Sequence, residues 1–320
     1  MKIRLSVLAA VAALGLLAPD AARADEIRIA TQPIPHYAPI FVARHKGWLD
    51  EELAAAGAPE TKWASFAAGP PINESFAAGQ QDIGFLGDTP ALIGRAAGID
   101  TRIIGITSTG PKTLAVIVAA NSPIKSPADL KGKKVAVTKG SYAHHLLALV
   151  LQQGGLGFGD IEQINLPNGE VPTTLIKGDI DAGAVWEPVL TKFRNQGAIR
   201  VLADGTGIKA GLLVIIASGD FVKTKPGQVK ALLRAYQRGA DYIRSNPKEA
   251  AELVSADTSL APDLLQQVFA NFDYAPPVDD TAVEEIKKSE AFMRAIGLIR
   301  TPVDVDAFVA RGLGPTVAAR

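Results

Sequence analysis

The sequence predicts an α/β protein with two lobes, and three observations support this prediction. The chain has 320 residues, which suits two lobes of roughly 100–150 residues each better than a single one. Short apolar runs alternate with helical stretches, which is typical of sheets wrapped by helices. A pattern in the first half of the chain recurs in the second half, as expected if the lobes are similar.

The composition excludes several classes of protein. Lys plus Arg and Asp plus Glu both number 33, and this zero formal charge argues against a nucleic-acid partner and against binding to acidic lipid. The chain has no Cys, which excludes disulfides, Cys-ligated zinc, iron–sulfur clusters and a catalytic thiol. Hydrophobic residues make up 48% and charged residues 21%, as in an ordinary globular protein.

Residues 1–24 are predicted to be a secretory signal peptide. Lys2 and Arg4 give a positive start, and the uncharged run Leu5–Leu17 is too short to span a bilayer. Ala22-Arg23-Ala24 places small residues at the two positions that a signal peptidase reads. A membrane anchor is the alternative, and the length of the run disfavours it. We therefore expect an exported protein, most simply a periplasmic one.

Eight apolar runs of the mature chain are predicted to be strands. They are Ile27–Ala30, Asp82–Leu86, Thr101–Ile106, Leu114–Ala119, Lys134–Val137, Gly183–Trp186, Ile199–Leu202 and Leu212–Ala217. The helices expected between them lie near Ile40–Glu52, Pro90–Ala97, Tyr142–Gln153 and Pro188–Asn195. This alternation predicts parallel sheets.

After Phe221 the pattern becomes mostly helical. The predicted helices are Pro226–Asn246, Pro247–Val254, Pro262–Phe272 and Asp279–Ala295, and proline opens the first three. The longest has one apolar face, formed by Val229, Leu232, Leu233, Tyr236, Ala240 and Ile243. A helix packed on a sheet explains this face.

The recurring pattern links two segments of the chain. Residues 76–84 lead into Gly87-Asp88-Thr89-Pro90, and residues 175–183 lead into Trp186-Glu187-Pro188. Each copy reads helix end, Gly, two residues, Asp, small apolar strand, acidic residue, Pro and a new helix. Gly suits the end of the first helix and Pro the start of the next. Coincidence in an Ala- and Gly-rich chain is the alternative.

Two similar α/β lobes predict a cleft at the carboxyl ends of their strands. We expect residues 25–113 with 217–320 to form lobe 1 and residues 114–216 to form lobe 2. The chain would cross between the lobes near Thr113–Val118 and return near Leu212–Ala217, as a pair of hinge strands.

Strand-to-helix junctions supply candidate anion-binding groups. In Gly87-Asp88-Thr89-Pro90, the proline places Thr89 at the helix N-cap, and in Lys139-Gly140-Ser141 the cap is Ser141. Helix N-termini expose unpaired N–H groups and about half a positive charge. The two caps would come from opposite lobes and hold an anion between them. The alternative is that both residues only cap their helices.

Other candidate site residues surround these junctions. A third junction contributes Gln32, His36 and Tyr37, and Lys139 and His144 would add positive charge.

Asp88 and Glu187 occupy matching places in the recurring pattern, and Trp186 could form an apolar wall of the cleft or belong to the core. Glu is not a preferred N-cap residue, so Glu187 could face the cleft or only stabilise its helix.

Catalysis and metal binding have no supporting pattern. The four histidines are His36, His45, His144 and His145, and adjacent histidines do not share a helix face. The sequence contains no Gly-x-Ser-x-Gly, His-Glu-x-x-His or Gly-x-x-x-x-Gly-Lys pattern. We expect no cofactor and no metal.

Several short motifs occur in order along the chain. They are Ala30-Thr31-Gln32-Pro33, Lys46-Gly47-Trp48-Leu49, residues 79–84, Gly87-Asp88-Thr89-Pro90, residues 130–137, Gly140-Ser141 and Trp186-Glu187-Pro188. Taken together, these motifs resemble the aliphatic-sulfonate-binding periplasmic proteins of ABC importers, whose relatives bind taurine, nitrate or thiamine precursors. The resemblance runs from about Ile27 to Phe308.

The resemblance implies a two-lobed, hinge-closing type II periplasmic binding protein fold. It implies an anion site at Gly87, Thr89, Gly140 and Ser141, with Trp186 and Glu187 beside it. Residues 35–37 and His144-His145 follow the family pattern only loosely.

The function expected from this resemblance is capture of a small organic anion, most simply an alkanesulfonate, by a monomer that delivers it to an ABC permease. Taurine, sulfate esters, nitrate and bicarbonate suit the same helix ends. A secreted enzyme related to pyrimidine synthases and a metal-binding transport protein are further alternatives.

Overall fold

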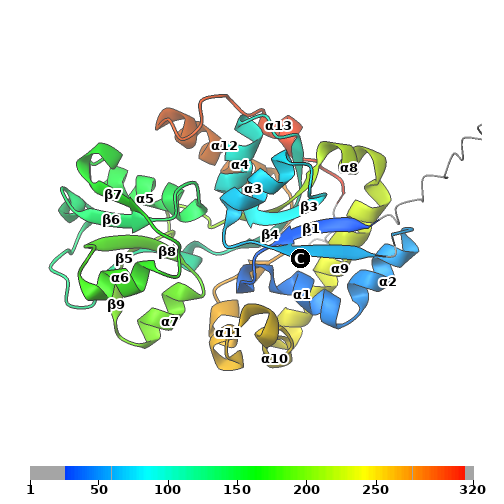
Figure 1. The fold of residues 1–320 in the computed structure, drawn as a ribbon, viewed down its shortest axis with the longest axis horizontal. Coiled ribbons are helices and arrows are strands. Elements are labelled where there is room, and N and C mark those ends of the chain that lie inside the picture. Colours follow the sequence, from blue (N-terminus) through cyan, green and yellow to red (C-terminus); the bar gives the residue numbers. More distant parts are fainter. Residues whose placement is uncertain (1–25, 59, 276, 314–320) are drawn as a thin grey trace, which may run out of the picture.

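The computed structural model describes residues 26–58, 60–275 and 277–313, so the predicted signal peptide at 1–24 lies outside the described residues. Two sheets lie side by side, each covered by helices (Figure 1). We call the part built on the six-stranded sheet lobe 1 and the part built on the five-stranded sheet lobe 2. No helix of the described residues is long and apolar enough to cross a membrane.

The sheet of lobe 1 has the strand order β11-β4-β10-β3-β1-β2. Its strands are β1 (Ile27–Thr31), β2 (Thr61–Ser65), β3 (Ile83–Gly87), β4 (Thr101–Thr109), β10 (Leu213–Ser218) and β11 (Asp273–Tyr274). Lobe 2 has the order β7-β6-β8-β5-β9. Its strands are β5 (Leu114–Ala119), β6 (Lys134–Val137), β7 (Glu162–Asn165), β8 (Ala182–Trp186) and β9 (Ile199–Asp204).

Apart from β11, the two sheets have the same arrangement. Strands β2, β1, β3, β10 and β4 match β7, β6, β8, β5 and β9 in order and direction. In each sheet the fourth strand runs antiparallel to both neighbours, so the sheets are mixed rather than parallel as expected. The reason is that β5 and β10 each follow a crossing between the lobes and enter the sheet in the reverse direction.

The recurring sequence pattern is confirmed as a structural repeat. Each copy runs from a helix through a left-handed glycine into a strand, at Gly79 (φ 66°) and Gly178 (φ 84°). Asp82 accepts a hydrogen bond from the backbone N–H of Arg28 at 2.9 Å, and Asp181 does the same for Lys134 at 2.8 Å. The matching aspartates therefore tie each strand to the start of its neighbour.

The helices between the strands differ from the prediction at several points. A single helix was expected over 40–52, but α1 (Ala38–His45) and α2 (Trp48–Ala55) are separated because Gly47 adopts φ 71°. The helices α3 (Gly69–Ala77) and α6 (Val171–Lys177) were predicted only at their ends, before Gly79 and Gly178 of the recurring pattern, and their starts were not predicted. The others lie close to their predicted ranges, namely α4 (Asp88–Ala96), α5 (Tyr142–Gln153) and α7 (Val189–Asn195).

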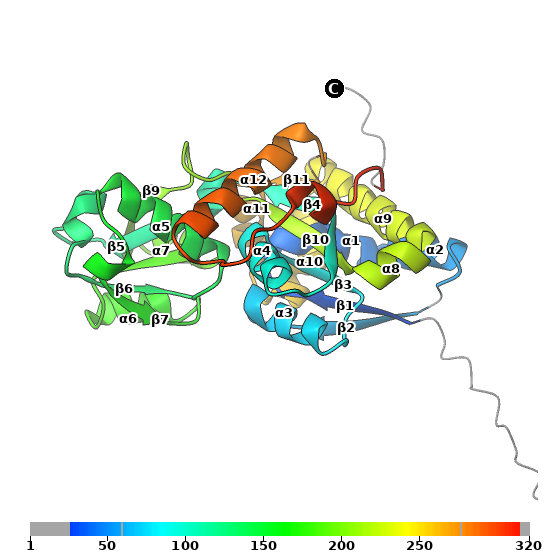
Figure 2. The same cartoon turned by 90° about the horizontal axis from the view of Figure 1, so that it is seen from above.

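The C-terminal region is helical, as predicted. It contains α8 (Gly219–Thr224), α9 (Pro226–Ser245), α10 (Pro247–Thr258), α11 (Pro262–Phe269), α12 (Asp280–Ala295) and α13 (Val305–Phe308). The apolar face of α9 packs in the same core as α1 and β1, whereas α12 packs with α4 over the other face of the sheet. Figure 2 shows α12 extending from lobe 1 toward α5 of lobe 2. The main hydrophobic core contains residues of both lobes, among them Tyr142 and Trp186.

Two short segments connect the lobes. The expected crossings included strands 114–118 and 212–217, but β5 lies wholly in the sheet of lobe 2 and β10 wholly in that of lobe 1. The chain crosses instead over residues 110–113 and 205–212. These segments lie against each other, with hydrogen bonds from Gly110 N to Ala210 O (3.0 Å) and from Gly205 N to Pro111 O (2.7 Å). A Cβ on Gly205 would lie 2.5 Å from Pro111 O, so only glycine fits there.

Candidate functional site

A small cavity lies between the lobes where the carboxyl ends of β1, β3, β6 and β8 meet. Its volume is about 10 Å³, roughly the room for one water molecule. Five predicted residues line it, namely Gln32, Tyr37, Gly87, Ser141 and Trp186. Ile34, Gly69, Pro90, Tyr142 and Leu213 also line it and were missed by sequence reasoning.

The N-terminus of α5 supplies lobe 2's polar groups to this cavity. Ser141 is the N-cap, as predicted, and its hydroxyl accepts a hydrogen bond from His144 N at 3.3 Å. The backbone N–H of Tyr142 has no partner among the described residues. This helix end therefore offers a free N–H, a hydroxyl and the positive end of a helix dipole.

A second helix start, α3, supplies lobe 1's polar group. Its first residues are Gly69, Pro70 and Pro71, so Gly69 carries the only N–H of these three, and that N–H has no partner among the described residues. The pair of prolines after glycine is a helix-start signal that could have found it. Gly69 is required because a Cβ would lie 2.5 Å from Pro90 Cγ.

The third helix start, α4, is not arranged as predicted. The helix begins at Asp88 with Gly87 as its N-cap, so Thr89 is its second residue rather than its cap. Asp88 N bonds to Leu212 O at 3.2 Å, and Thr89 N bonds to the Asp88 carboxylate at 2.7 Å. The carboxylate of Asp88 therefore neutralises the positive end of its own helix. Thr89 is buried and does not line the cavity.

Aromatic and amide groups form the remaining walls. The rings of Tyr142 and Trp186 are 5.8 Å apart, and Gln32 donates to the Tyr37 hydroxyl at 3.2 Å and to Phe85 O at 3.3 Å. Tyr37 can therefore donate its own hydroxyl hydrogen into the cavity.

His36 lies behind this wall and connects the lobes. It is 0% exposed, and its Nε2 lies 2.8 Å from the hydroxyl of Tyr142. Burial lowers the pKa of His36 to about 3, so it is neutral near pH 7. Its Nδ1 is buried without a partner among the described residues.

His144 does not supply the expected positive charge. Burial and the charge of Lys139 lower its pKa to about 4. Its Nε2 lies 2.6 Å from the amide nitrogen of Gln163, and its ring packs against Phe158. Gly140 N donates to His144 Nδ1 at 3.2 Å, so this histidine fixes the loop before α5. It is a neutral part of lobe 2's interior.

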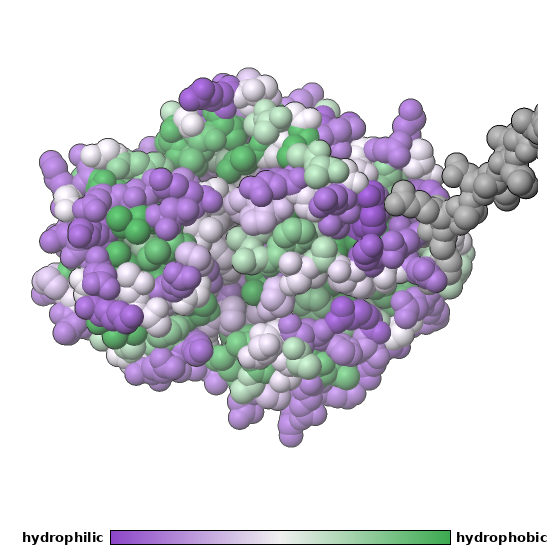
Figure 3. Space-filling view, in the orientation of Figure 1, coloured by the Kyte–Doolittle hydropathy of each residue, from purple (hydrophilic) through white to green (hydrophobic). Residues whose placement is uncertain are grey.

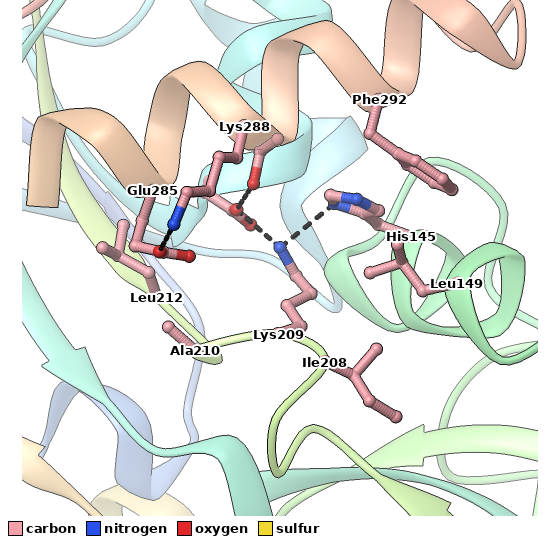
Figure 4. A pocket seen from close by; sticks show the side chains of 11 residues that line it. His145, Leu149, Ile208, Lys209, Ala210, Leu212, Glu285, Lys288 and Phe292 are labelled. Carbon is pink, nitrogen blue, oxygen red and sulfur yellow. Dashed lines mark hydrogen bonds and ion pairs between the residues drawn. The ribbon is translucent and has the colours of Figure 1, made fainter. Parts of the chain in front are cut away.

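Asp88 lines a different cavity, of about 80 Å³, together with residues of α12 such as Phe292. Figure 4 shows this cavity, with the side chains of Lys209 and His145 directed toward each other. The carboxylate of Asp88 accepts from Lys209 Nζ at 2.6 Å and from Ser289 Oγ at 2.9 Å, and Lys209 Nζ lies 3.1 Å from His145 Nδ1. Burial, the largest single effect, would raise the pKa of Asp88, but the charge of Lys209, the neighbouring His145 and the hydrogen bonds from Lys209 and Ser289 together outweigh it, and the pKa is lowered. Lys209 was missed because it lies far from Asp88 in the sequence.

Glu187 is 0% exposed and is occupied by helix contacts. Its carboxylate accepts from Thr191 N at 3.0 Å and Thr191 Oγ1 at 2.6 Å, and from Asn271 Nδ2 of lobe 1 at 3.0 Å. Burial raises its pKa although the Thr191 bonds oppose the rise. Of the two roles expected for Glu187, facing the cleft or stabilising its helix, the structure shows the second. The carboxylate also contacts lobe 1 through Asn271.

Glycines allow the lobes to approach each other. A Cβ on Gly87 would lie 3.1 Å from Tyr142 Cβ, and one on Gly140, at φ 76°, would lie 3.3 Å from Pro70 Cγ. Both contacts join opposite lobes, so the structure is a closed form. Figure 3 shows hydrophilic residues over the outer edges of both lobes and paler residues where the lobes meet.

The lining residues carry no charged side chain. The nearby carboxylates of Asp88 and Glu187 are held by other groups, and His36 and His144 are neutral. The electrostatic character of the cavity comes from two helix N-termini, which favour an anion.

This arrangement is that of a two-lobed periplasmic binding protein, and the solved structures agree. The alkanesulfonate-binding protein SsuA from Xanthomonas axonopodis pv. citri, bound to MOPS, matches with a TM-score of 0.81 and 25% identity over 89% of this chain and 98% of that chain. The periplasmic aliphatic sulphonate binding protein SsuA from Escherichia coli matches with a TM-score of 0.80 and 26% sequence identity, over 92% of this chain and 94% of that chain.

The chain belongs to the NMT1/THI5-like family, which it matches over residues 34–250. A putative aliphatic sulfonates-binding protein of Escherichia coli (strain K12) is 34% identical over 68% of each chain. Another from Bacillus subtilis (strain 168) is 29% identical over 85% of this chain and 80% of that protein.

Proposed function

We propose that this protein is the periplasmic solute-binding component of an ABC importer and that it captures an aliphatic sulfonate. The observation that carries the proposal is the pair of helix N-termini, α3 of lobe 1 and α5 of lobe 2, whose free N–H groups at Gly69 and Tyr142 belong to one cavity between the lobes. The names of the sulfonate-binding relatives support the same ligand class.

The cavity of about 10 Å³ is smaller than a sulfonate, so the lobes would close around the ligand less tightly than they meet here. Gly69 N, Tyr142 N and the hydroxyls of Ser141 and Tyr37 would donate to its oxygens, and Trp186 would contact its carbon atoms. Residues 25–113 with 217–320 and residues 114–216 would move as two units about the crossing segments, and a membrane permease would recognise the closed form. The protein would act as a monomer and would perform no chemistry on its ligand.

Taurine is the second candidate, because a taurine-binding periplasmic protein of Escherichia coli is 26% identical over 62% of each chain. Its ammonium group would need a free carboxylate. Asp88 and Glu187 are the acidic residues beside the cavity, and both are already paired. The site therefore favours a sulfonate with an uncharged tail.

Isothermal titration calorimetry with methanesulfonate, ethanesulfonate, taurine and nitrate tests the proposal. We expect the alkanesulfonates to bind most tightly. Ser141→Ala should weaken ethanesulfonate binding by about 1.5–3 kcal/mol, because it removes a hydrogen bond to a charged group. Thr89→Ala is the matched control, since Thr89 lies outside the cavity, and it should leave the affinity unchanged. No binding of any alkanesulfonate would refute the proposed function.

A further inference from the structure

Tyr142 is a side chain of lobe 2 that contacts lobe 1 at two places. It is the first residue of α5, and its Cβ would lie 3.1 Å from a Cβ placed on Gly87 of lobe 1. Its hydroxyl meets His36 Nε2 at 2.8 Å. The ring therefore spans the junction between the lobes at the cavity itself.

His36 holds the hydroxyl end of this ring at a fixed place. The imidazole is fully buried, and its ring lies 4.7 Å from that of Phe272 in an edge-to-face contact. Burial and the neighbouring charges keep the Tyr142 hydroxyl protonated by raising its pKa. Trp186 supports the ring from the side of lobe 2.

The ring and a ligand tail compete for one space. Tyr142 also contributes the free N–H to which we assign the sulfonate, so the tail begins beside its own ring. The cavity of about 10 Å³ is too small for any sulfonate, so the lobes must part somewhat to admit the ligand. The other walls around the tail are the buried residues Tyr37, Trp186 and Leu213, which leave the Tyr142 ring as the group that a longer tail would meet. A long tail would displace the ring and break its contact with His36, which would prevent full closure.

We propose that Tyr142 restricts this protein to short-chain alkanesulfonates and that His36 is the positioning residue that holds Tyr142 in place. This inference rests on the proposed function and adds a limit on tail length to it.

The experiment compares methanesulfonate with hexanesulfonate by isothermal titration calorimetry. The parent protein should prefer methanesulfonate. Tyr142→Ala should shift the ratio of the two affinities toward hexanesulfonate by at least about tenfold, because the truncated side chain leaves room for methylene groups. Tyr142→Leu is a second variant that keeps an apolar side chain, should the alanine variant fail to fold.

Two further variants separate size from positioning. Tyr142→Phe keeps the ring but loses the contact with His36, so it should weaken methanesulfonate binding about fivefold. Tyr142→Phe should also reduce the preference for methanesulfonate over hexanesulfonate, because His36 no longer holds the ring in place. Tyr242→Ala, at a tyrosine that packs on Trp48 away from the cavity, should leave the ratio unchanged.

The outcomes distinguish the two proposals. A parent protein that binds both sulfonates but prefers hexanesulfonate would overturn the length limit and leave the proposed function standing, as would equal losses of both affinities in Tyr142→Ala and Tyr142→Leu. Failure of the parent to bind either sulfonate would refute the proposed function and the length limit with it.

Discussion

The ammonium of Lys209 lies 2.6 Å from the carboxylate of Asp88, and both side chains are buried, with 4% and 2% exposed. Lys209 belongs to the segment that returns to lobe 1, and Asp88 opens α4. Ser289 of α12 also donates to this carboxylate, and His145 of lobe 2 lies beside the ammonium. One buried ion pair thus joins a crossing segment, both lobes and the C-terminal region.

Lys209→Met should destabilise the protein strongly, because it leaves the Asp88 carboxylate buried and unpaired. We expect a loss of about 3–5 kcal/mol in the free energy of unfolding, measured with urea. Adding Asp88→Asn should recover part of the loss. Lys288→Met, at an exposed lysine on the same cavity, is the control and should change little. Equal stability of Lys209→Met and the parent would contradict this role.

Buried histidines should make the protein sensitive to mild acid. The pKa values of His36 and His145 are lowered to about 3 and that of His144 to about 4, whereas the unfolded chain titrates near 6.5. The unfolded state therefore binds more protons below pH 6.5. Stability is complete above that value and falls as the pH drops toward the folded pKa values.

The loss should reach about 2 kcal/mol per histidine at pH 5, measured by urea unfolding. His36→Gln should reduce the slope of the unfolding free energy against pH by the equivalent of about one bound proton. Asp88 has a lowered pKa and adds its own loss only below its ordinary value of 3.8, outside this range. An unfolding free energy that stays constant from pH 7 to pH 5 would contradict the burial of these rings.

Gly87→Ala should weaken ligand binding, because a Cβ on Gly87 would lie 3.1 Å from Tyr142 Cβ of the opposite lobe and hinder closure. The added Cβ would press against Tyr142 only when the lobes meet. Such overpacking costs about 1–3 kcal/mol, so the affinity for ethanesulfonate should fall about tenfold or more.

Gly159→Ala, in lobe 2 with no atom within 4 Å of the new Cβ, is the matched control. Calorimetry gives the affinities and thermal denaturation the stabilities. A Gly87→Ala protein with parental affinity would show that binding does not need this contact.

Glu187→Gln should not distinguish taurine from ethanesulfonate. The carboxylate is bound by Thr191 and Asn271, so its charge does not serve the ligand. Stability should fall by about 1–3 kcal/mol, because the amide NH₂ would face the N–H of Thr191. The two ligands are compared by calorimetry, and a selective loss of taurine affinity would place Glu187 in the site after all.

Local patterns predicted most of the elements that surround the cavity. Strands such as Leu114–Ala119 and Lys134–Val137, and the helix Tyr142–Gln153, have the predicted bounds because apolar runs and cap residues mark them. The edge strands β2 and β7 were missed because they are partly exposed and carry polar residues.

The site was harder to predict than the fold, because its contacts join distant parts of the chain. Ser141 could be assigned from its position before a helix. Thr89 was assigned as a cap from the proline after it, but Asp88 fills the helix end itself. The contacts of His36 with Tyr142 and of Lys209 with Asp88 join residues more than 100 positions apart, which no local pattern reports.

The two crossing segments are bonded to each other at Gly110–Ala210 and Gly205–Pro111, and this pairing has a mechanical consequence. Two separate linkers would let lobe 2 twist, slide and tilt, whereas a pair held side by side resists sliding and leaves bending as the soft motion. Lobe 2 should therefore swing about a single axis through the paired segments, so that each closure brings Ser141 back to face Gly69 in the same register.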